Sequence, residues 1–424
     1  FINNSGGSHP FQIRESSGGS AYSTGVTNNG ASSGNIDFAP VFNSPGQLVY
    51  QCTSHGGMVG NIYLRDAAGN NTNVGVVTAT AFVPTNQNLS HRNKIINGSQ
   101  TIFQRGTSEV RSGGNDGYYN GLGDRWAIRM HSSVAQTTFS QDTSDNPHGF
   151  GSNQKSVRAN AGSSNAAKYF VYDTKLEGQD LQDFAKGTSS AKEFTLSFYV
   201  KTGVSGVYCI EMRDLDNSRM VGGTYTVSNG NWNRYVITFP ADTTGAFGND
   251  NGASLWVRFW LAAGSNYTSG TARTAWAGSI SDSILAVGQT AQVGDNVADT
   301  WQITGIQLEV GSVATPFEHR SHGEELSRCQ RYYIKDTMVR EGSGYGVVTG
   351  ALDSIVGIQV DFPVTMRDTP SLSLLGTTYR TGGSANAQRI SSTGFIWGRK
   401  QTGSGTFNGA AYATGGYEVS AELG

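Results

Sequence analysis

Cysteine is scarce in this chain of 424 residues, and the three that occur lie far apart. Cys52, Cys209 and Cys329 are an odd number without a C-x-x-C spacing, which indicates neither a disulfide framework nor a zinc site. Charged residues make up only 15% of the chain, below the roughly 25% of an average globular domain. The formal net charge is -2 and no stretch of sequence clusters Lys with Arg, so we expect no nucleic-acid partner.

Long apolar runs are also absent. None approaches the ~18 residues of a membrane-spanning helix, so we expect no membrane insertion. The first residues lack the basic end and the apolar stretch of a signal peptide. The sequence opens at Phe1 without an initiator Met, and we expect further residues upstream.

Enzyme signatures are missing as well. The sequence has no G-x-S-x-G elbow, no H-E-x-x-H helix and no phosphate-binding Walker loop, so we expect no enzyme. The paired carboxylates of a glycan-cleaving enzyme can come from distant strands, which leaves a depolymerase as an alternative.

What the sequence does contain is typical of an all-β protein. Glycine is the commonest residue at 57, and Ser, Thr and Asn are plentiful, a mixture that suits short strands joined by tight turns. With 37% hydrophobic and 10% aromatic residues, the chain can bury sizeable cores. Its length exceeds the ~250 to 300 residues at which single cores stop growing, so two to four domains are expected.

Apolar and polar residues alternate in the middle of the chain. Phe194, Leu196, Phe198 and Val200 alternate with more polar residues, which predicts a strand with one packed face and one solvent face. Together with further strand-like runs, this predicts several β-sandwich or jelly-roll modules in series. The expected parts are a partial β-sandwich at 1–66, a linker at 67–92, a sandwich at 93–320, a helix and connector at 321–339, and a C-terminal β domain at 340–424.

One helix is indicated near 322–335. Ser321 can cap the first free N–H groups, and Glu324 stands at the position from which a capping box reaches back. Leu326, Cys329 and Tyr333 then follow at helical spacing. The stretch from Leu176 to Phe184 is the other helical candidate.

A second pattern combines soft metal ligands. Cys52, His55 and Met58 share one short loop after an apolar strand, and His9 lies upstream. A thiolate, two imidazoles and a weak thioether are the ligands of trigonal copper sites with a long axial bond. This part resembles the cupredoxins, the plastocyanin and amicyanin group, whose first strands would have to precede Phe1. By that resemblance His9, Cys52 and His55 are equatorial copper ligands and Met58 is axial. The alternative is a docking module without metal, in which Cys52 is a small buried hydrophobe.

Two further segments bracket the predicted sandwich. The opening, 93–107, contains I-N-G and Q-R-G, and the close, 301–320, contains Q-L-E-x-G and A-T-P-F-E-x-R. With Asp124-Arg125-Trp126 between them and a continuation to Tyr333, they resemble a sandwich domain of tail fibres and other appendages of tailed phages, of the marine phage type. Such domains look like carbohydrate-binding modules, so the resemblance implies binding to surface glycans.

Tryptophans are the candidate sugar platforms. Most of those in the sandwich segment are expected in the core, including Trp256 and Trp260, which lie four apart and so share a face. Trp397, among Arg399 and Lys400, is the candidate for an exposed ligand contact. The acidic loop at 213–217 could hold a hard cation, although an ordinary turn is the simpler interpretation.

By this resemblance we expect a virion structural protein, a tail-fibre or appendage subunit that attaches to host-surface glycans. The resemblance implies a homotrimer on the outside of the particle, in contact with other virion proteins. A head fibre or decoration protein, a depolymerase tailspike and a copper-binding cupredoxin-type protein remain as alternatives.

Overall fold

The computed structural model describes most of the chain. The described residues are 1–64, 91–337 and 355–423, except 6, 42–43, 229, 376, 381–385, 401–410 and 415. The chain forms two compact units, residues 1–83 and 84–424. Of the predicted linker 67–92, residues 67–90 lie outside the described part.

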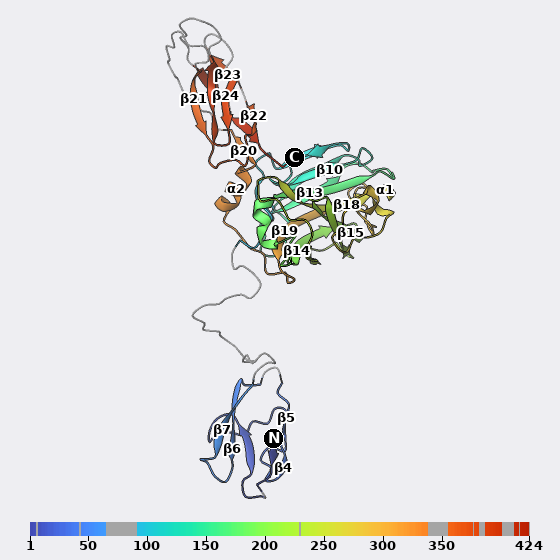
Figure 1. Ribbon diagram of the computed structural model, residues 1–424. Helices are drawn as coiled ribbons and strands as arrows, with labels where there is room; N and C mark the ends of the chain where they lie inside the picture. The colour runs from blue at the N-terminus through green and yellow to red at the C-terminus, as the bar shows by residue number, and fades with distance from the viewer. Residues whose placement is uncertain are drawn as a thin grey trace. The chain divides into compact units, whose positions relative to one another are not determined.

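The first unit is a small β domain (Figure 1). Its strands are β1 (Ile2–Asn3), β2 (Phe11–Arg14), β3 (Val26–Thr27), β4 (Gly34–Asn35), β5 (Asp37–Phe38), β6 (Gln47–Cys52) and β7 (Val59–Tyr63). Strands β2, β6 and β7 form an antiparallel sheet in that order. Ile13, Tyr22, Ile36 and Leu48 form its buried core.

The second unit contains a sandwich of two six-stranded antiparallel sheets (Figure 1). One sheet, here called the β18 sheet, has the order β16-β15-β18-β13-β10-β9. These strands are Arg219–Val227, Gly206–Asp214, Ala253–Ala263, Tyr169–Glu177, Ala127–Met130 and Asp116–Gly117. The other, the β19 sheet, has the order β17-β14-β19-β12-β11-β8. Its strands are Asn233–Phe239, Phe194–Thr202, Thr300–Val310, Asn153–Arg158, Thr137–Asp142 and Ser108–Arg111. The prediction of an all-β protein with jelly-roll sandwiches is therefore confirmed.

The core between the two sheets comes from alternating strand positions. Phe194, Leu196, Phe198 and Val200 of β14 are all buried in it, as their alternation predicts. The prediction of a solvent-exposed opposite face is wrong near the start of the same strand. Thr195 is fully buried there because the segment after β19 covers it, and its hydroxyl donates to the carbonyl of Gly311 at 2.7 Å.

Helices are short and few in the described residues. The predicted capping residue is confirmed, because Oγ of Ser321 accepts the N–H of Glu324 at 3.2 Å. Helix α2 (His322–Gln330) ends earlier than predicted, at Gln330. The reason is that Tyr333–Asp336 forms strand β20 and pairs with β27 (Tyr417–Ser420). The stretch before Phe184 forms a 3₁₀ helix, η1 (Gly178–Phe184), and the remaining elements are α1 (Ser265–Thr268) and η2 (Asp282–Ile284). No helix in the described residues is long and apolar enough to cross a membrane.

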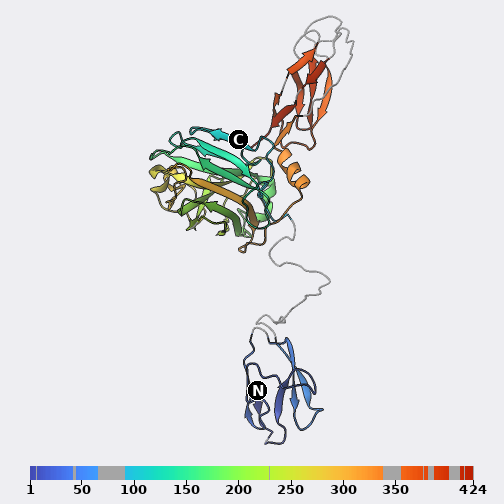
Figure 2. The same ribbon diagram turned by 180° about the vertical axis from the view of Figure 1, so that it is seen from behind.

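The C-terminal strands form a separate bundle, seen from behind in Figure 2. Besides β20 and β27 they are β21 (Ile355–Asp361), β22 (Ser371–Leu374), β23 (Thr377–Arg380), β24 (Asn386–Ser391), β25 (Gly394–Lys400) and β26 (Ala411–Thr414). The sheets have the orders β20-β27-β22, β21-β25-β24 and β23-β26. The chain end ties this bundle to the sandwich, because Glu422 forms ion pairs with Arg105 and Arg125.

Candidate functional sites

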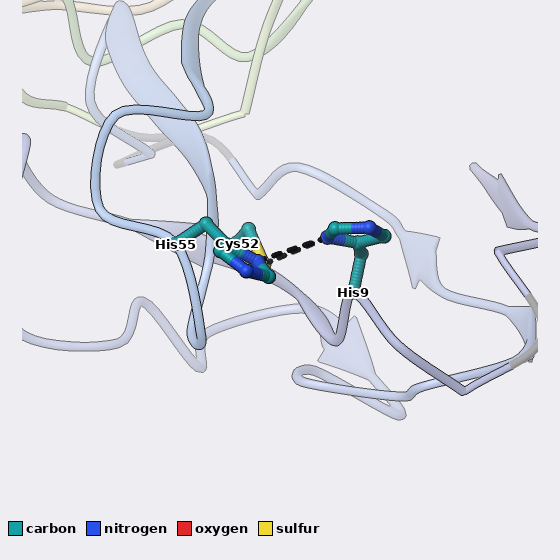
Figure 3. Close-up of side chains that lie close together, drawn as sticks. All are labelled: His9, Cys52 and His55. Carbon is teal, nitrogen blue, oxygen red and sulfur yellow. Dashed lines mark hydrogen bonds between the residues drawn. The ribbon is translucent and has the colours of Figure 1, made fainter.

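Three predicted metal ligands lie together in the first unit (Figure 3). Cys52 is the last residue of β6, and Phe11 of β2 pairs with it across the sheet, which brings His9 alongside. The tight turn between β6 and β7 carries His55, whose carbonyl accepts the N–H of Met58 at 3.0 Å. Antiparallel pairing and one turn therefore assemble the cluster.

The donor atoms of this cluster have the spacing of a shared ion. The Nδ1 atoms of His9 and His55 are 3.0 Å apart, and Sγ of Cys52 lies 3.8 Å and 3.6 Å from them. Nitrogen and sulfur ligands bound at about 2.0 to 2.3 Å to one ion are themselves about 3.3 to 3.8 Å apart. The two sulfur distances fit this range, whereas the two nitrogen atoms lie closer than the range and have the spacing of a hydrogen bond.

The fourth predicted ligand lines the same cavity. Met58 is 51% exposed and, together with His9 and Cys52, lines a pocket of about 560 Å³. Phe11 and Tyr50, stacked with ring centroids 5.4 Å apart, form an apolar wall of this pocket. A thioether beside two imidazoles and a thiol is a donor set that suits copper, because hard cations prefer oxygen ligands.

The predicted contact residue Trp397 does not lie on the surface. Its side chain is 3% exposed and packs in the core of the C-terminal bundle, against Phe395. The prediction of an exposed ligand contact at Trp397 is wrong, because β25 directs this side chain inward. Its indole N–H has no hydrogen-bond partner among the described residues.

The sandwich tryptophans divide into buried and partly exposed ones. Trp126, Trp260, Trp276 and Trp301 are buried, whereas Trp232 and Trp256 are partly exposed. Trp256 and Trp260 share a face of β18, as predicted, but this is the outer face of the β18 sheet. The expectation that both pack in the core is therefore wrong for Trp256. Trp260 is buried because the segment 264–290 covers its end of the face.

Two neighbouring rows of side chains surround Trp256 on that outer face. The strand register places Lys175 and Arg213 beside Trp256 in one row. In the next row it places Asp173 and Glu211 beside Arg258. Arg129 of β10 also reaches this face. This cluster was not predicted from the sequence, because its members come from four strands. The available signal was the alternation Asp173-x-Lys175, Glu211-x-Arg213 and Trp256-x-Arg258, which puts each pair on one face.

The two carboxylates of the face, Asp173 and Glu211, accept hydrogen bonds from its arginine side chains. Glu211 is fully buried and accepts from Nε of Arg213 at 2.7 Å, Nη1 of Arg258 at 2.9 Å and Nε1 of Trp260 at 3.1 Å. Asp173 accepts from Nε of Arg129 at 2.9 Å. Burial raises the pKa of Asp173, although Arg129 and Arg258 act in the opposite direction. Burial also lowers the pKa of Lys175, and the nearby Arg129 lowers it further. The hydrogen bonds to Asp173 and Glu211 hold the guanidinium groups of Arg129, Arg213 and Arg258 in fixed positions.

Comparisons with known proteins give structural likenesses of low similarity. No family model and no curated protein matches the sequence. Among solved structures, the bacteriophage CBA120 tailspike protein 4 enzymatically active domain matches with a TM-score of 0.26 and 9% identity. That match covers 51% of this chain and 21% of the tailspike chain, about a fifth of its length. The CBM22-1 xylan-binding domain from Paenibacillus barcinonensis Xyn10C matches with a TM-score of 0.24 and 10% identity, over 53% of this chain and 99% of that one. TmCBM61 in complex with β-1,4-galactotriose matches with a TM-score of 0.24 and 10% identity, over 52% and 99%.

The acidic loop at 213–217 belongs to a different cluster. The carboxylate of Asp214 is fully buried and accepts from Nζ of Lys186 at 2.5 Å and from the backbone N–H of Asn217 at 3.0 Å. Nζ of Lys186 also lies 3.1 Å from Oδ2 of Asp242. The Lys186 ammonium group thus lies beside the carboxylate that was considered as a ligand for a hard cation. This agrees with the simpler interpretation of residues 213–217 as an ordinary turn.

Proposed function

We propose that this chain is a virion structural protein, a tail-fibre or appendage subunit that binds host-surface glycans through its sandwich domain. The observation that carries the proposal is the outer face of the β18 sheet, where a partly exposed indole, Trp256, lies among fixed hydrogen-bond donors. A flat aromatic face that stacks on a sugar ring, flanked by polar groups that orient the hydroxyls, is the combination a saccharide site requires.

The placement on a virion rests on the sequence. The segments 93–107 and 301–320 resemble appendage proteins of tailed phages in the same order, and that resemblance also motivates a homotrimer attached to other virion proteins. Sedimentation of the full chain tests the trimer, because a monomer at micromolar concentration would contradict it. Imaging of the particle distinguishes a tail position from a head fibre or decoration protein.

Glycan binding is tested by affinity electrophoresis of the full chain in gels that contain polysaccharide from the host surface. We expect retardation that Trp256→Ala abolishes and that Trp232→Ala leaves unchanged, since Trp232 lies outside the β18 sheet and donates to Asp145. Equal retardation of both variants and the unaltered protein would remove the Trp256 face from the proposal. New reducing ends after incubation with the same polysaccharide would favour a depolymerase instead.

A second function is supported by the cluster in the first unit. We propose that His9, Cys52 and His55 bind a copper ion, with Met58 as a weak axial ligand, and that the domain serves as a copper-binding cupredoxin-type module. The observation is the mutual distance of the three donor atoms, all within 4.8 Å of one another. When bound, copper supplies one-electron chemistry. The chain contributes the end of β6, which carries Cys52, and the neighbouring turn and loop, which carry His55 and His9.

Titration of the full chain with Cu(II) tests this second function. We expect one equivalent to bind with a strong visible absorption from the Cys52 thiolate, and Cys52→Ala to lose that band. Cys209→Ala is the matched control, because Cys209 is a buried thiol of the sandwich whose pKa is raised by burial to about 12. If the unaltered protein stays colourless and retains no copper on gel filtration, the first unit is a docking module without metal.

A further inference from the structure

The Trp256 face carries an excess of positive charge. Among the residues that the structure describes, four cationic groups lie within 5.5 Å of the centroid of the indole ring: Arg258 at 4.4 Å, Arg129 and Lys175 at 4.8 Å, and Arg213 at 5.5 Å. These four cations face the two carboxylates of Asp173 and Glu211, which leaves a formal charge of +2 on the face. This excess stands out because the whole chain has a formal net charge of -2.

The neighbouring charges do not neutralise this excess. Asp116, on the edge strand β9, lies 4.0 Å from Arg129 and is 43% exposed, so its attraction is screened by solvent. Glu177, farther along β13, is fully buried and engaged by Arg331 at 2.8 Å. Even if Asp116 is counted, the face keeps a formal charge of +1.

Both ends of the face are covered, and the middle is accessible. At one end Trp260 lies under the segment 264–290, and at the other Arg331 covers Glu177. Between them the side chains of Arg129 and Arg213 remain 22% and 21% exposed, beside the partly exposed Trp256. Arg129 donates to Asp173 through Nε, and Arg213 contacts Glu211 through Nε and Nη2, so each guanidinium group uses one edge on a carboxylate of the face.

We infer that the Trp256 face binds an acidic saccharide, whose sugar ring contacts Trp256 and whose carboxylate or sulfate group pairs with Arg213 and Arg129. Arginine is suited to this role because its planar fork binds carboxylates and sulfate-like oxyanions through two parallel hydrogen bonds. The cation–π contacts with the indole hold the forks in place before the ligand arrives. This inference rests on the proposed glycan binding and names the class of glycan.

Two matched pairs of polysaccharides test the class of ligand by calorimetric titration of the full chain. Polygalacturonate is compared with its fully methyl-esterified form, and dextran sulfate with dextran. We expect at least one acidic member to bind tenfold or more tightly than its neutral counterpart, and this preference to weaken as salt is raised. The first pair reports a carboxylate ligand and the second a sulfate ligand.

The variant Arg213→Gln tests the position of the site. Loss of one charge-assisted, two-pronged contact should weaken binding of the acidic glycan about tenfold, and Arg213→Lys should restore only part of it. Arg234→Gln is the control, because Arg234 is an exposed arginine of β17 in the opposite sheet. Glu211 keeps Arg258 and Trp260 as partners in Arg213→Gln, and circular dichroism verifies that the variant is folded.

The outcomes separate the two proposals. If none of the four polysaccharides nor host polysaccharide binds, the proposed glycan binding fails. If neutral and acidic glycans bind equally, or if Arg213→Gln and Arg234→Gln have the same effect, glycan binding survives and the acidic class is refuted. Tighter binding to a single-stranded oligonucleotide or to vesicles of anionic lipid would also refute it.

Discussion

Replacing Lys186 by Met should unfold the sandwich at a markedly lower temperature. The Lys186 ammonium is 4% exposed and donates to Asp214 at 2.5 Å and to the carbonyls of Thr244 at 3.1 Å and Gly245 at 2.7 Å. Met has a similar length but neither charge nor donors. The substitution leaves the fully buried Asp214 carboxylate with only the neutral amides of Asn217 as partners.

The expected loss follows from the cost of an uncompensated buried charge. Breaking a buried ion pair by removing one partner costs about 3 to 5 kcal/mol of unfolding free energy. Asp242 keeps Arg219 as a second partner at 2.7 Å, so most of the loss arises at Asp214. In a domain of this size, each kcal/mol lowers the melting temperature by about 2 to 4 °C, which gives a total of about 6 to 20 °C.

Differential scanning calorimetry of the full chain measures this shift. Lys192→Met, at an exposed lysine, is the control and should change the melting temperature by about 1 °C or less. The double variant Lys186→Met with Asp214→Asn should recover much of the lost stability, because it removes the unpaired charge. A Lys186→Met protein that melts with the control would refute the argument that this buried ion pair stabilises the sandwich.

Three further perturbations have defined outcomes. Burial raises the pKa of Asp124 to about 6, although Arg105 opposes it, so the folded state gains a proton as pH falls from about 7 to about 4 and becomes more stable. In Asp124→Asn, the gain in unfolding free energy between about pH 7 and about pH 4 should be smaller by about 3 kcal/mol, measured by urea unfolding at both pH values. Glu422→Gln leaves the buried Arg125 without its carboxylate and should cost about 3 kcal/mol, detected as faster hydrogen exchange in β27. Met58→Leu should keep copper bound but raise its reduction potential, measured by spectroelectrochemistry, because a weak axial donor is lost.

Strand β14 and the proximity of His9, Cys52 and His55 could be predicted from the sequence because their signals are local. The alternation over Phe194–Val200 identifies β14 without knowledge of its neighbours. The helix start at Ser321 was found for the same reason, since a capping residue acts within four positions. The helix end was missed because β20 is defined by its pairing with β27, more than eighty residues later.

Exposure was harder to predict than secondary structure. Trp397 precedes Gly398, Arg399 and Lys400 in the sequence, which suggested exposure, yet it is buried because β25 faces the core of its bundle. Trp256 was expected in the core because it shares a face with Trp260, yet it is partly exposed, because that face is the outer one of the β18 sheet and the segment 264–290 covers Trp260 but not Trp256. In both cases the deciding information is which face of a sheet another part of the chain covers. A single strand does not contain that information.

The two candidate sites differ in the same way. In the candidate metal site, Cys52, His55 and Met58 lie on one short loop and a single strand pair brings His9 alongside, so the proximity of these residues could be expected from the sequence. The Trp256 face takes its cations from four strands, with β10 and β18 more than a hundred residues apart. Its charge excess exists only after the register of the β18 sheet is fixed, and the average charge of the chain even has the opposite sign. For an all-β surface, an argument from net charge therefore has to be made for each sheet face, after the strand pairing is known.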